Sequence, residues 1–441
     1  MTGPSEVQQL LKIIAQAAND ALNEYARHGE EVPSIYETKT HPLDIAETAF
    51  TLKKAIRTLE GACNQLCSTL APPLHTVINN AHDYYWSCLR VAAKKGLADI
   101  LYDHQGGLHI EVLSQRVGIN QGKLATIMRT LASRHCFHEV AKDVYANSRL
   151  SLALRSQTPG AAFLNLQTSE GQQAAFYFQR YLDDPTYGPS TDLKHTTFTY
   201  SITGFQGTFY DWIKQNVMTR GMSGMNQVMG TLSILEVFPW EKYSTICDVG
   251  GGNGSFTWPL IQKYPALKVT MFDLPETIAA AEKVATQKIN VNQVEFSSGN
   301  FFEKSPPHNL DIYYLRNIIH NWPDESAVSI LKSVRAAMGE HSRLLIHDYI
   351  LPSYHEDTSA NAAYSLFKAP FPMLPDFGYG NMRLHNQDLT MLFMYNSKER
   401  TVVELIGLSQ GAGLVLSNVW DLGETAVLEF TKSNKSNNRT G

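Results

Sequence analysis

Residues 245–256, T-I-C-D-V-G-G-G-N-G-S-F, constrain the fold of this chain more than any other stretch. A short apolar run ends near Asp248, and a glycine-rich turn follows before a helix-compatible segment resumes. Glycine adopts backbone angles that are closed to other residues, and its missing side chain lets a ligand approach the bare N–H groups at a helix start. The stretch therefore predicts a strand, a glycine turn and a helix. Whether the turn holds a ligand or only connects the two elements stays open at this point.

The next strand narrows the choice of ligand. Residues 268–274, K-V-T-M-F-D-L, are typical of a buried strand, and Asp273 at its end follows the glycines by about 20 residues. A carboxylate there can accept hydrogen bonds from both hydroxyls of a bound ribose. The glycines follow a G-x-G-x-G pattern instead of the G-x-G-x-x-G spacing of dinucleotide loops. A loop for S-adenosylmethionine therefore fits better than one for NAD.

Composition excludes several classes of protein. The 441 residues allow two domains, and a net charge of −5 gives no reason to expect nucleic acid or an anionic membrane as partner. The five cysteines include no C-x-x-C pair, so we expect reduced, structural thiols and no metal site. The N-terminus lacks the features of a signal peptide, and no stretch approaches 18 uninterrupted apolar residues. We therefore expect a cytoplasmic protein.

The chain before the glycine turn is mostly helical by pattern. Residues 1–80 place apolar side chains at helix spacing, with a second helix expected over 45–70. These helices can serve a dimer contact, a cover for the substrate or the chain's own core. Residues 160–240 are rich in aromatics and Met, which suits either a core or the enclosure of a flat apolar substrate.

Between these regions the pattern outlines a winged helix-turn-helix. Helices are expected to end at 97–101 and to span 110–117 and 124–132, with strands at 137–140 and 144–146. The stretch that would serve as recognition helix, residues 121–135, carries only Lys123, Arg129 and Arg134 as cations, while phosphate binding needs several on one exposed face. We therefore do not expect DNA binding, although a transcription regulator remains a rival hypothesis.

From residue 244 onward strands and helices alternate. This alternation predicts an α/β fold with a doubly wound, Rossmann-like sheet that binds its ligand at the carboxyl ends of the strands. Strands are expected at 245–249, 268–273, 294–298, 310–318, 343–350, 414–421 and 426–431, and helices after 255, 276, 324, 387 and 401. The Pro- and Gly-rich residues 353–387 predict an irregular loop, either a rim of the site or a solvent loop.

The candidate chemistry lies after the fourth strand. His320 follows that strand, so it faces the same crevice as the glycine turn, and a histidine can take a proton from a phenol or enol. Asp348 ends the fifth strand and Glu399 lies in S-K-E-R-T; either can orient the imidazole and stabilise its charged form. Three other histidines lack such a setting and are expected to be ordinary surface or loop residues: His341, His347 and His385.

Six motifs together resemble the caffeate-type class I S-adenosylmethionine-dependent O-methyltransferases, in particular their fungal natural-product branch. These motifs are D-V-G-G-G-N-G, F-D-L-P, G-N-F-F, L-R-N-I-I-H-N-W-P-D, D-Y-I-L-P and K-E-R-T, and the likeness covers about residues 85–432. The resemblance implies a homodimer without nucleic-acid or membrane partners. It also implies three regions: a helical extension over 1–80, a winged-helix dimerisation and substrate-cover domain over 81–240, and an S-adenosylmethionine-binding domain over 241–441.

The resemblance further assigns roles to single residues. The glycines would bind the methionine part of S-adenosyl-L-methionine, Asp273 the ribose, and Asn300, Phe301 and Arg316 would lie near the adenine. The full set of implied cofactor-binding positions is Asp248, Gly250, Gly251, Gly252, Asp273, Leu274, Asn300, Phe301 and Arg316. His320 would be the general base beside Asp348 and Glu399, with no metal. This chain departs from the common pattern at three positions: Asn300 replaces Asp, Arg316 replaces Lys, and Asp348 replaces Glu.

The function implied is methyl transfer to a phenolic or enolic hydroxyl of an aromatic or polyketide-type secondary metabolite. The chain would hold the oxygen in place and remove its proton. An alternative exists on the same scaffold, because related proteins catalyse pericyclic cyclisation or dehydration of pyridones and polyketides without moving a methyl group. A fold alone does not separate these activities; His320 with two acids favours methyl transfer.

Overall fold

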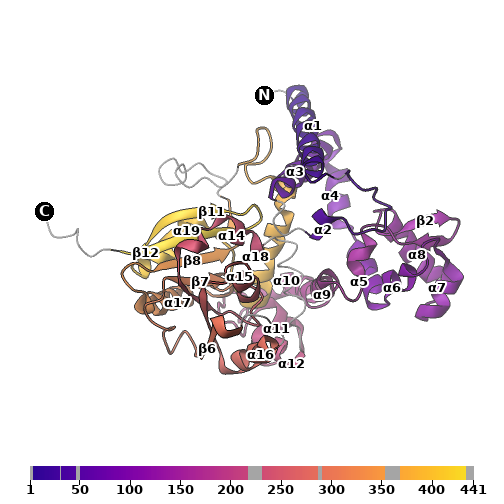
Figure 1. Ribbon diagram of the computed structural model, residues 1–441. Helices are drawn as coiled ribbons and strands as arrows, with labels where there is room; N and C mark the ends of the chain where they lie inside the picture. The colour runs from indigo at the N-terminus through magenta and orange to yellow at the C-terminus, as the bar shows by residue number, and fades with distance from the viewer. Residues whose placement is uncertain are drawn as a thin grey trace. The chain divides into compact units, whose positions relative to one another are not determined.

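The computed structural model describes residues 3–29, 31–45, 50–216, 231–286, 291–352 and 368–433 (Figure 1). The chain divides into two compact units, one of residues 1–184 with 197–229 and one of residues 185–196 with 230–441. Within the described ranges, none of the helices has the length and apolar content needed to cross a bilayer.

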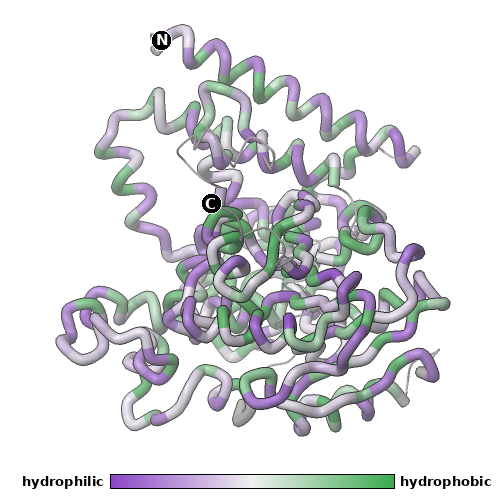
Figure 2. Tube along the Cα trace, turned by 90° about the vertical axis from the view of Figure 1, so that its left-hand side faces the viewer, coloured by the Kyte–Doolittle hydropathy of each residue, from purple (hydrophilic) through white to green (hydrophobic). Residues whose placement is uncertain are grey.

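The first unit begins with a pair of long helices, α1 (Gly3–Arg27) and α3 (Phe50–Leu70), which pack along each other. Gln65, near the end of α3, donates a hydrogen bond to Glu6, near the start of α1, so the helices run antiparallel. In Figure 2 the trace of α1 alternates between hydrophilic and hydrophobic residues, as expected for a helix with one covered face. The short helices α2 (Pro42–Ile45) and α4 (Pro73–Ala81) complete this region.

A winged helix follows, as predicted. Its helices are α5 (Tyr85–Lys94), α6 (Leu97–Tyr102), α7 (Ile110–Val117) and α8 (Gln121–Ala132); its strands β1 (Leu108–His109), β2 (His138–Ala141) and β3 (Val144–Ala146) pair antiparallel in the order β1-β3-β2. Gly118 ends α7 in the left-handed conformation, and the Asn120 side chain caps α8. Leu113, Leu124 and Phe137 form part of the core between these elements.

The aromatic-rich segment contributes to a core. It forms α9 (Pro159–Leu166), the π-helical turn η2 (Gln167–Gly171), α10 (Gln172–Asp183), α11 (Thr197–Ser201) and α12 (Phe209–Asn216). Phe198 is buried and makes edge-on contacts with Phe209 and Trp212, with ring centroids 4.9 and 5.5 Å apart. For these residues the core interpretation holds. The methionines of residues 217–230 lie outside the described residues.

The second unit contains a mixed sheet of seven strands within the described ranges, in the order β11-β12-β8-β7-β4-β5-β6. The strands are β4 (Thr245–Val249), β5 (Lys268–Asp273), β6 (Val294–Ser298), β7 (Ile312–Arg316), β8 (Arg343–Asp348), β11 (Leu414–Asp421) and β12 (Ala426–Lys432). The five strands from β6 to β8 are parallel, while β12 runs antiparallel to β8 and β11 antiparallel to β12. In Figure 1 these strands run in colour from red to yellow.

Helices cover both faces of this sheet, so the predicted doubly wound fold is confirmed. Cys247 and Val249 of β4 pack in one core with α17 (Asp324–Ala337) and α19 (Val402–Gly411). Ile246 packs in the other core with α15 (Thr257–Lys263) and α16 (Pro275–Ala285). This split follows from the alternation of side chains along a strand.

The order of the strands fixes where a ligand can bind. From β4 the chain moves outward to β5 and β6, and then returns to place β7 on the other side of β4. Such a reversal leaves a crevice at the carboxyl ends of the two central strands. The glycine turn follows β4 and the turn of His320 follows β7, so both begin at this crevice.

The long connection after β8 is shorter than predicted. Residues 353–367 lie outside the described residues, and residues 378–381 form the turn η7 (Gly378–Asn381). The helix α18 (Met382–Tyr395) begins directly after this turn, before the expected position 387. The run M-R-L-H-N, residues 382–386, is compatible with a helix, so α18 begins before the position expected from the sequence.

Candidate active site

The glycine turn needs glycine for two separate reasons. Gly250, Gly252 and Gly254 have φ angles of 74°, 57° and 81°, which side-chain-bearing residues rarely adopt. A Cβ at Gly254 would lie 2.3 Å from Nε1 of Trp258, whereas a Cβ at Gly252 would meet nothing within 4 Å. Trp258 therefore fills the space beside Gly254, whereas no atom of the described residues occupies the space beside Gly252.

This difference gives a prediction for two alanine variants. Gly252→Ala carries only the strain of a left-handed alanine, about 1–2 kcal/mol of lost unfolding free energy. Gly254→Ala also displaces the rigid indole of Trp258, which donates to the carbonyl of Asn253 at 2.8 Å, and overpacking adds about 1–3 kcal/mol. Urea unfolding of both variants measures the difference. Equal losses for the two would contradict the closed side of the turn.

Two carboxylates flank the turn. Asp273 at the end of β5 accepts hydrogen bonds from the backbone N–H of Gly252 at 2.9 Å and of Leu274 at 2.7 Å. Asp248 is buried below the turn, and burial raises its pKa to about 6, even though Thr257 donates to it at 2.7 Å and Arg316 lies nearby. The turn thus presents its N–H groups next to negative charge.

Arg316 at the end of β7 forms hydrogen bonds to two side chains near the glycine turn. Its Nη2 donates to Oγ of Ser255 at 2.6 Å, and its Nη1 donates to Oγ1 of Thr231 at 3.1 Å. The guanidinium lies 5.7 Å from the ring centre of Phe256. The structure therefore brings Arg316 together with the glycine turn.

Asn300 and Phe301 lie at the opposite side of the crevice, after β6. The Asn300 side chain accepts from the N–H of Phe302 at 3.0 Å and donates to Glu303 at 3.0 Å, so its recorded bonds stay within its own turn. The ring of Phe301 lies edge-on to Trp322 with centroids 6.0 Å apart. β4 and β5 separate β7 from β6 in the sheet, and the contact with Trp322 brings Phe301 against the segment that follows β7.

His320 and Glu399 form a buried pair. His320 lies in the helical turn η6 (Ile319–Asn321), and its Nδ1 is 2.7 Å from Oε1 of Glu399, with relative exposures of 4% and 0%. This contact occupies Nδ1 and leaves Nε2 as the ring atom that can accept a substrate proton. Burial alone lowers the pKa of His320, but the charges of Glu399 and Asp348 outweigh it and raise the pKa to about 9.

Asp348 acts on this pair through its charge. It ends β8 and is buried, and burial raises its pKa while charged His320 and Arg400 oppose the rise. The recorded side-chain contact of the imidazole runs to Glu399. Of the two acids proposed from the sequence, Glu399 therefore orients the ring, and Asp348 contributes negative charge beside it.

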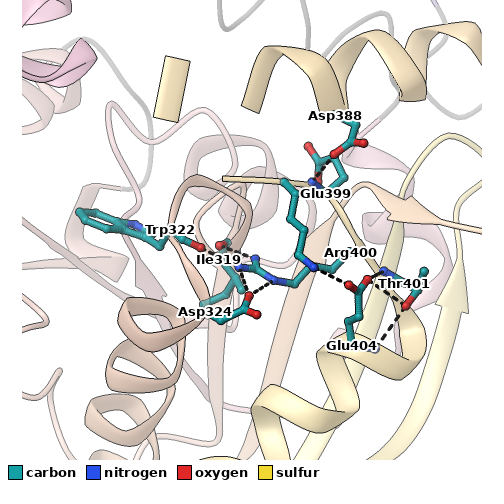
Figure 3. Close-up of polar contacts among 9 residues, drawn as sticks. Ile319, Trp322, Asp324, Asp388, Glu399, Arg400, Thr401 and Glu404 are labelled. Atoms are coloured by element: carbon teal, nitrogen blue, oxygen red, sulfur yellow. Dashed lines mark hydrogen bonds and ion pairs between the residues drawn. The ribbon is translucent and has the colours of Figure 1, made fainter. Parts of the chain in front are cut away.

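Arg400 clamps the turn that carries His320, as Figure 3 shows. Its guanidinium donates to the carbonyl oxygens of Ile319 at 3.0 Å and Trp322 at 2.7 Å, one on each side of His320, and to Oδ1 of Asp324 at 2.8 Å. The side chain of Arg400 is only 2% exposed. Because Glu399 precedes Arg400, one short segment holds both the imidazole and the backbone around it.

A second element fixes the same segment. β9 (Ile350–Leu351), just after Asp348, pairs in parallel with β10 (Arg400–Thr401), just after Glu399. The backbone N–H of Glu399 donates to Asp388 of α18 at 2.8 Å, and a capping box between Thr401 and Glu404 starts α19 (Figure 3). Neither the clamp nor this pairing was predicted.

A conservative change at the clamp tests its importance. Arg400→Lys keeps the charge but loses the planar fork that reaches two carbonyls and a carboxylate together. We expect the unfolding free energy to fall by about 1–3 kcal/mol and turnover to fall with it, because the His320 turn loosens. Arg335→Lys is the matched control, since Arg335 donates to the carbonyl of Gly413. Equal turnover in both variants would argue against the clamp.

His347 corrects an expectation from the sequence. It is fully buried on β8, with Nδ1 2.6 Å from the Tyr314 hydroxyl and Nε2 2.9 Å from Oγ1 of Thr425. The expectation of a surface or loop residue was wrong because β8 lies between β7 and β12 and is covered on both faces. His385 also has a buried partner, since its Nε2 lies 2.9 Å from Oδ2 of Asp376. His341 is exposed, as expected.

The residues around the crevice fit a positively charged nucleoside. Several buried oxygens beside His320 have no hydrogen-bond partner among the described residues, among them Oδ1 of Asp348, Oε2 of Glu399 and the hydroxyl of Tyr349. In the same part, no group of three or more His, Cys, Asp or Glu residues is arranged to hold a metal ion. Surplus buried acid favours a cationic ligand, and a sulfonium is one.

Comparison with known proteins gives the family of this chain. The sequence model of the O-methyltransferase domain matches residues 181–415, and that of the O-methyltransferase dimerisation domain matches residues 82–156. This chain belongs to the O-methyltransferase family. A relative of this O-methyltransferase, 3-O-methyltransferase 2 of Phanerochaete chrysosporium, is 36% identical over 437 residues, which cover 96% of each chain. The resemblance stated from the sequence motifs is thereby confirmed.

Solved structures share the fold of this O-methyltransferase. A structure titled "A Pericyclic Reaction enzyme" is 21% identical, with a TM-score of 0.68, and the match covers 86% of this chain and 95% of that one. LepI, solved in complex with SAM, is 21% identical, with a TM-score of 0.66 and coverage of 85% and 93%. At this level of identity the likeness concerns the fold, so the chemistry rests on the site itself.

Proposed function

We propose that this O-methyltransferase uses S-adenosyl-L-methionine to methylate a phenolic or enolic hydroxyl of a flat aromatic or polyketide-type metabolite, with His320 as general base. The observation that carries the proposal is the buried contact of 2.7 Å between Nδ1 of His320 and Glu399, at the crevice that the glycine turn also borders. A base there removes a proton, and the neighbouring acids stabilise the cation that results.

The residues that would hold the cofactor lie along the carboxyl ends of β4 to β7. The glycine turn of Gly250, Gly251 and Gly252, above buried Asp248, would bind its methionine part. Asp273, with the neighbouring Leu274, would bind the ribose, and Asn300 and Phe301 would flank the adenine. Arg316, which donates to Ser255 just after the glycine turn, would also lie near the adenine. When bound, the cofactor supplies an electrophilic methyl group.

His320 would perform the proton transfer. Its Nδ1–H is held by Glu399, so Nε2 can accept the proton of the substrate hydroxyl. Asp348 and Glu399 give the imidazolium a buried negative environment, which favours the state reached after the transfer. The proposal also includes a homodimer formed through the dimerisation domain and a cytoplasmic site of action.

The proposal is tested with labelled S-adenosyl-L-methionine and three phenols of increasing size: catechol, naphthol and dihydroxyanthraquinone. We expect binding heat on addition of the cofactor, a mass gain of one methyl unit and release of S-adenosylhomocysteine. A pathway extract supplies further acceptors. A product of unchanged mass would support the pericyclase alternative, and a product lighter by one water would support the dehydratase alternative. No binding of the cofactor would refute the proposal.

A further inference from the structure

Tyr349 stands out among the buried residues of the crevice. It follows Asp348 directly, is 0% exposed, and its ring lies nearly parallel to the imidazole of His320, with centroids 5.9 Å apart and planes 11° apart. Its hydroxyl has no hydrogen-bond partner among the described residues. A hydroxyl that has lost water without gaining a partner is unfavourable, so such a group calls for an explanation.

The surroundings place this hydroxyl at the crevice. Burial raises the pKa of Tyr349, and the charges that act on it belong to Glu399, Arg316, Glu424 and Asp348. Asp348 and Arg316 end β8 and β7, and Glu424 lies just before β12, whose Ala426 pairs with Asp348. All four groups therefore stand at the same edge of the sheet. With a raised pKa the hydroxyl keeps its proton and remains a hydrogen-bond donor.

We propose that the hydroxyl of Tyr349 is a second substrate-binding group, which donates a hydrogen bond to the oxygen that His320 deprotonates. This inference rests on the proposed function. The substrate proton moves to Nε2 of His320, while Tyr349 keeps its own proton and donates to the oxygen as negative charge develops there. A hydrogen bond to a charged oxygen is stronger than one to a neutral hydroxyl, so it stabilises the transition state more than the bound substrate.

Tyr349→Phe separates this role from a structural one, because phenylalanine keeps the ring against His320 and removes only the hydroxyl. We expect kcat to fall about 10- to 100-fold, as for loss of a hydrogen bond to a charged group, with a smaller change in KM. The pH at which the rate rises stays that of the parent enzyme, since Glu399 and Asp348 are intact. The thermal midpoint of the free protein stays equal or rises, because among the described residues the hydroxyl has no partner to lose.

Tyr313→Phe is the matched control in the same sheet. The Tyr313 hydroxyl donates to the carbonyl oxygens of Pro307 at 2.6 Å and Ala337 at 2.9 Å and accepts from the N–H of Leu310 at 3.3 Å, so its loss breaks existing hydrogen bonds. We expect Tyr313→Phe to lower the thermal midpoint and to leave kcat unchanged. The two variants thus change stability and turnover in opposite ways.

Two results would overturn the inference. A midpoint for Tyr349→Phe that drops as far as that of Tyr313→Phe would show that its hydroxyl is already bonded within the free protein. Parent-like turnover of the best of the three phenols by Tyr349→Phe would show that only the ring matters. If the parent enzyme methylates neither the phenols nor an acceptor of the extract, the proposed function fails, and the unfolding comparison still decides whether the Tyr349 hydroxyl is unpartnered.

Discussion

Replacement of His320 by alanine is expected to lower kcat about 100- to 10,000-fold, the contribution typical of a positioned general base. Cofactor affinity should stay near that of the parent, because the glycine turn and Asp273 lie on other strands. Rates with the methyl acceptor and calorimetric titration with S-adenosyl-L-methionine measure the two quantities separately.

His341→Ala serves as the control for this variant. His341 is exposed before β8 and makes no part of the candidate site, so its loss should change neither rate nor affinity. If His320→Ala kept the parent rate, proton removal by this imidazole would be excluded. If it lost cofactor binding as well, His320 would have a role in the shape of the crevice and not only in proton transfer.

The second large effect concerns pH. His320 works as a base only when it is unprotonated, and its pKa in the free enzyme is raised to about 9, so kcat/KM should climb with pH through that region. Glu399→Gln removes a negative charge 2.7 Å from the ring while burial continues to favour the neutral imidazole. The pKa of His320 therefore falls, and the rise in kcat/KM moves to lower pH.

The same variant should lower the maximal rate about 10- to 100-fold, because the imidazolium that forms loses its partner and its orientation. Glu404→Gln is the control: Glu404 bonds Thr401 and Lys398 at the start of α19, so its loss affects the helix and leaves the pH profile in place. A pH profile of Glu399→Gln that matches the parent would contradict the coupling between Glu399 and His320.

The parts of this protein that sequence patterns predicted are those with a local cause. The strands at 245–249, 268–273 and 294–298 have the bounds expected from their apolar runs, and the turn after β4 follows from its glycines. The sequence predicts that His320 and Glu399 lie together, because strand ends meet at one edge of a sheet and because a known family shares these motifs.

The parts that were missed depend on contacts between distant segments. β9 and β10 have two residues each, so neither carries a periodic signal, and only their mutual pairing defines them. The motif K-E-R-T alone suggests that Arg400 is a surface cation, because its partners are backbone carbonyls of the distant His320 turn. His347 shows the reverse error: a polar residue in L-L-I-H-D suggests exposure, although its strand lies inside the sheet and is covered on both faces.

The pairing of β9 with β10 has a consequence for how such enzymes diversify. Residue 350 is joined to residue 400 by two strands, so both acids beside His320 are fixed by the pairing at the ends of the intervening chain. Changes in the intervening residues that spare this pairing, and Asp388 that accepts the N–H of Glu399, therefore leave both acids in place. The sequence between the two strands can vary further than the strands themselves.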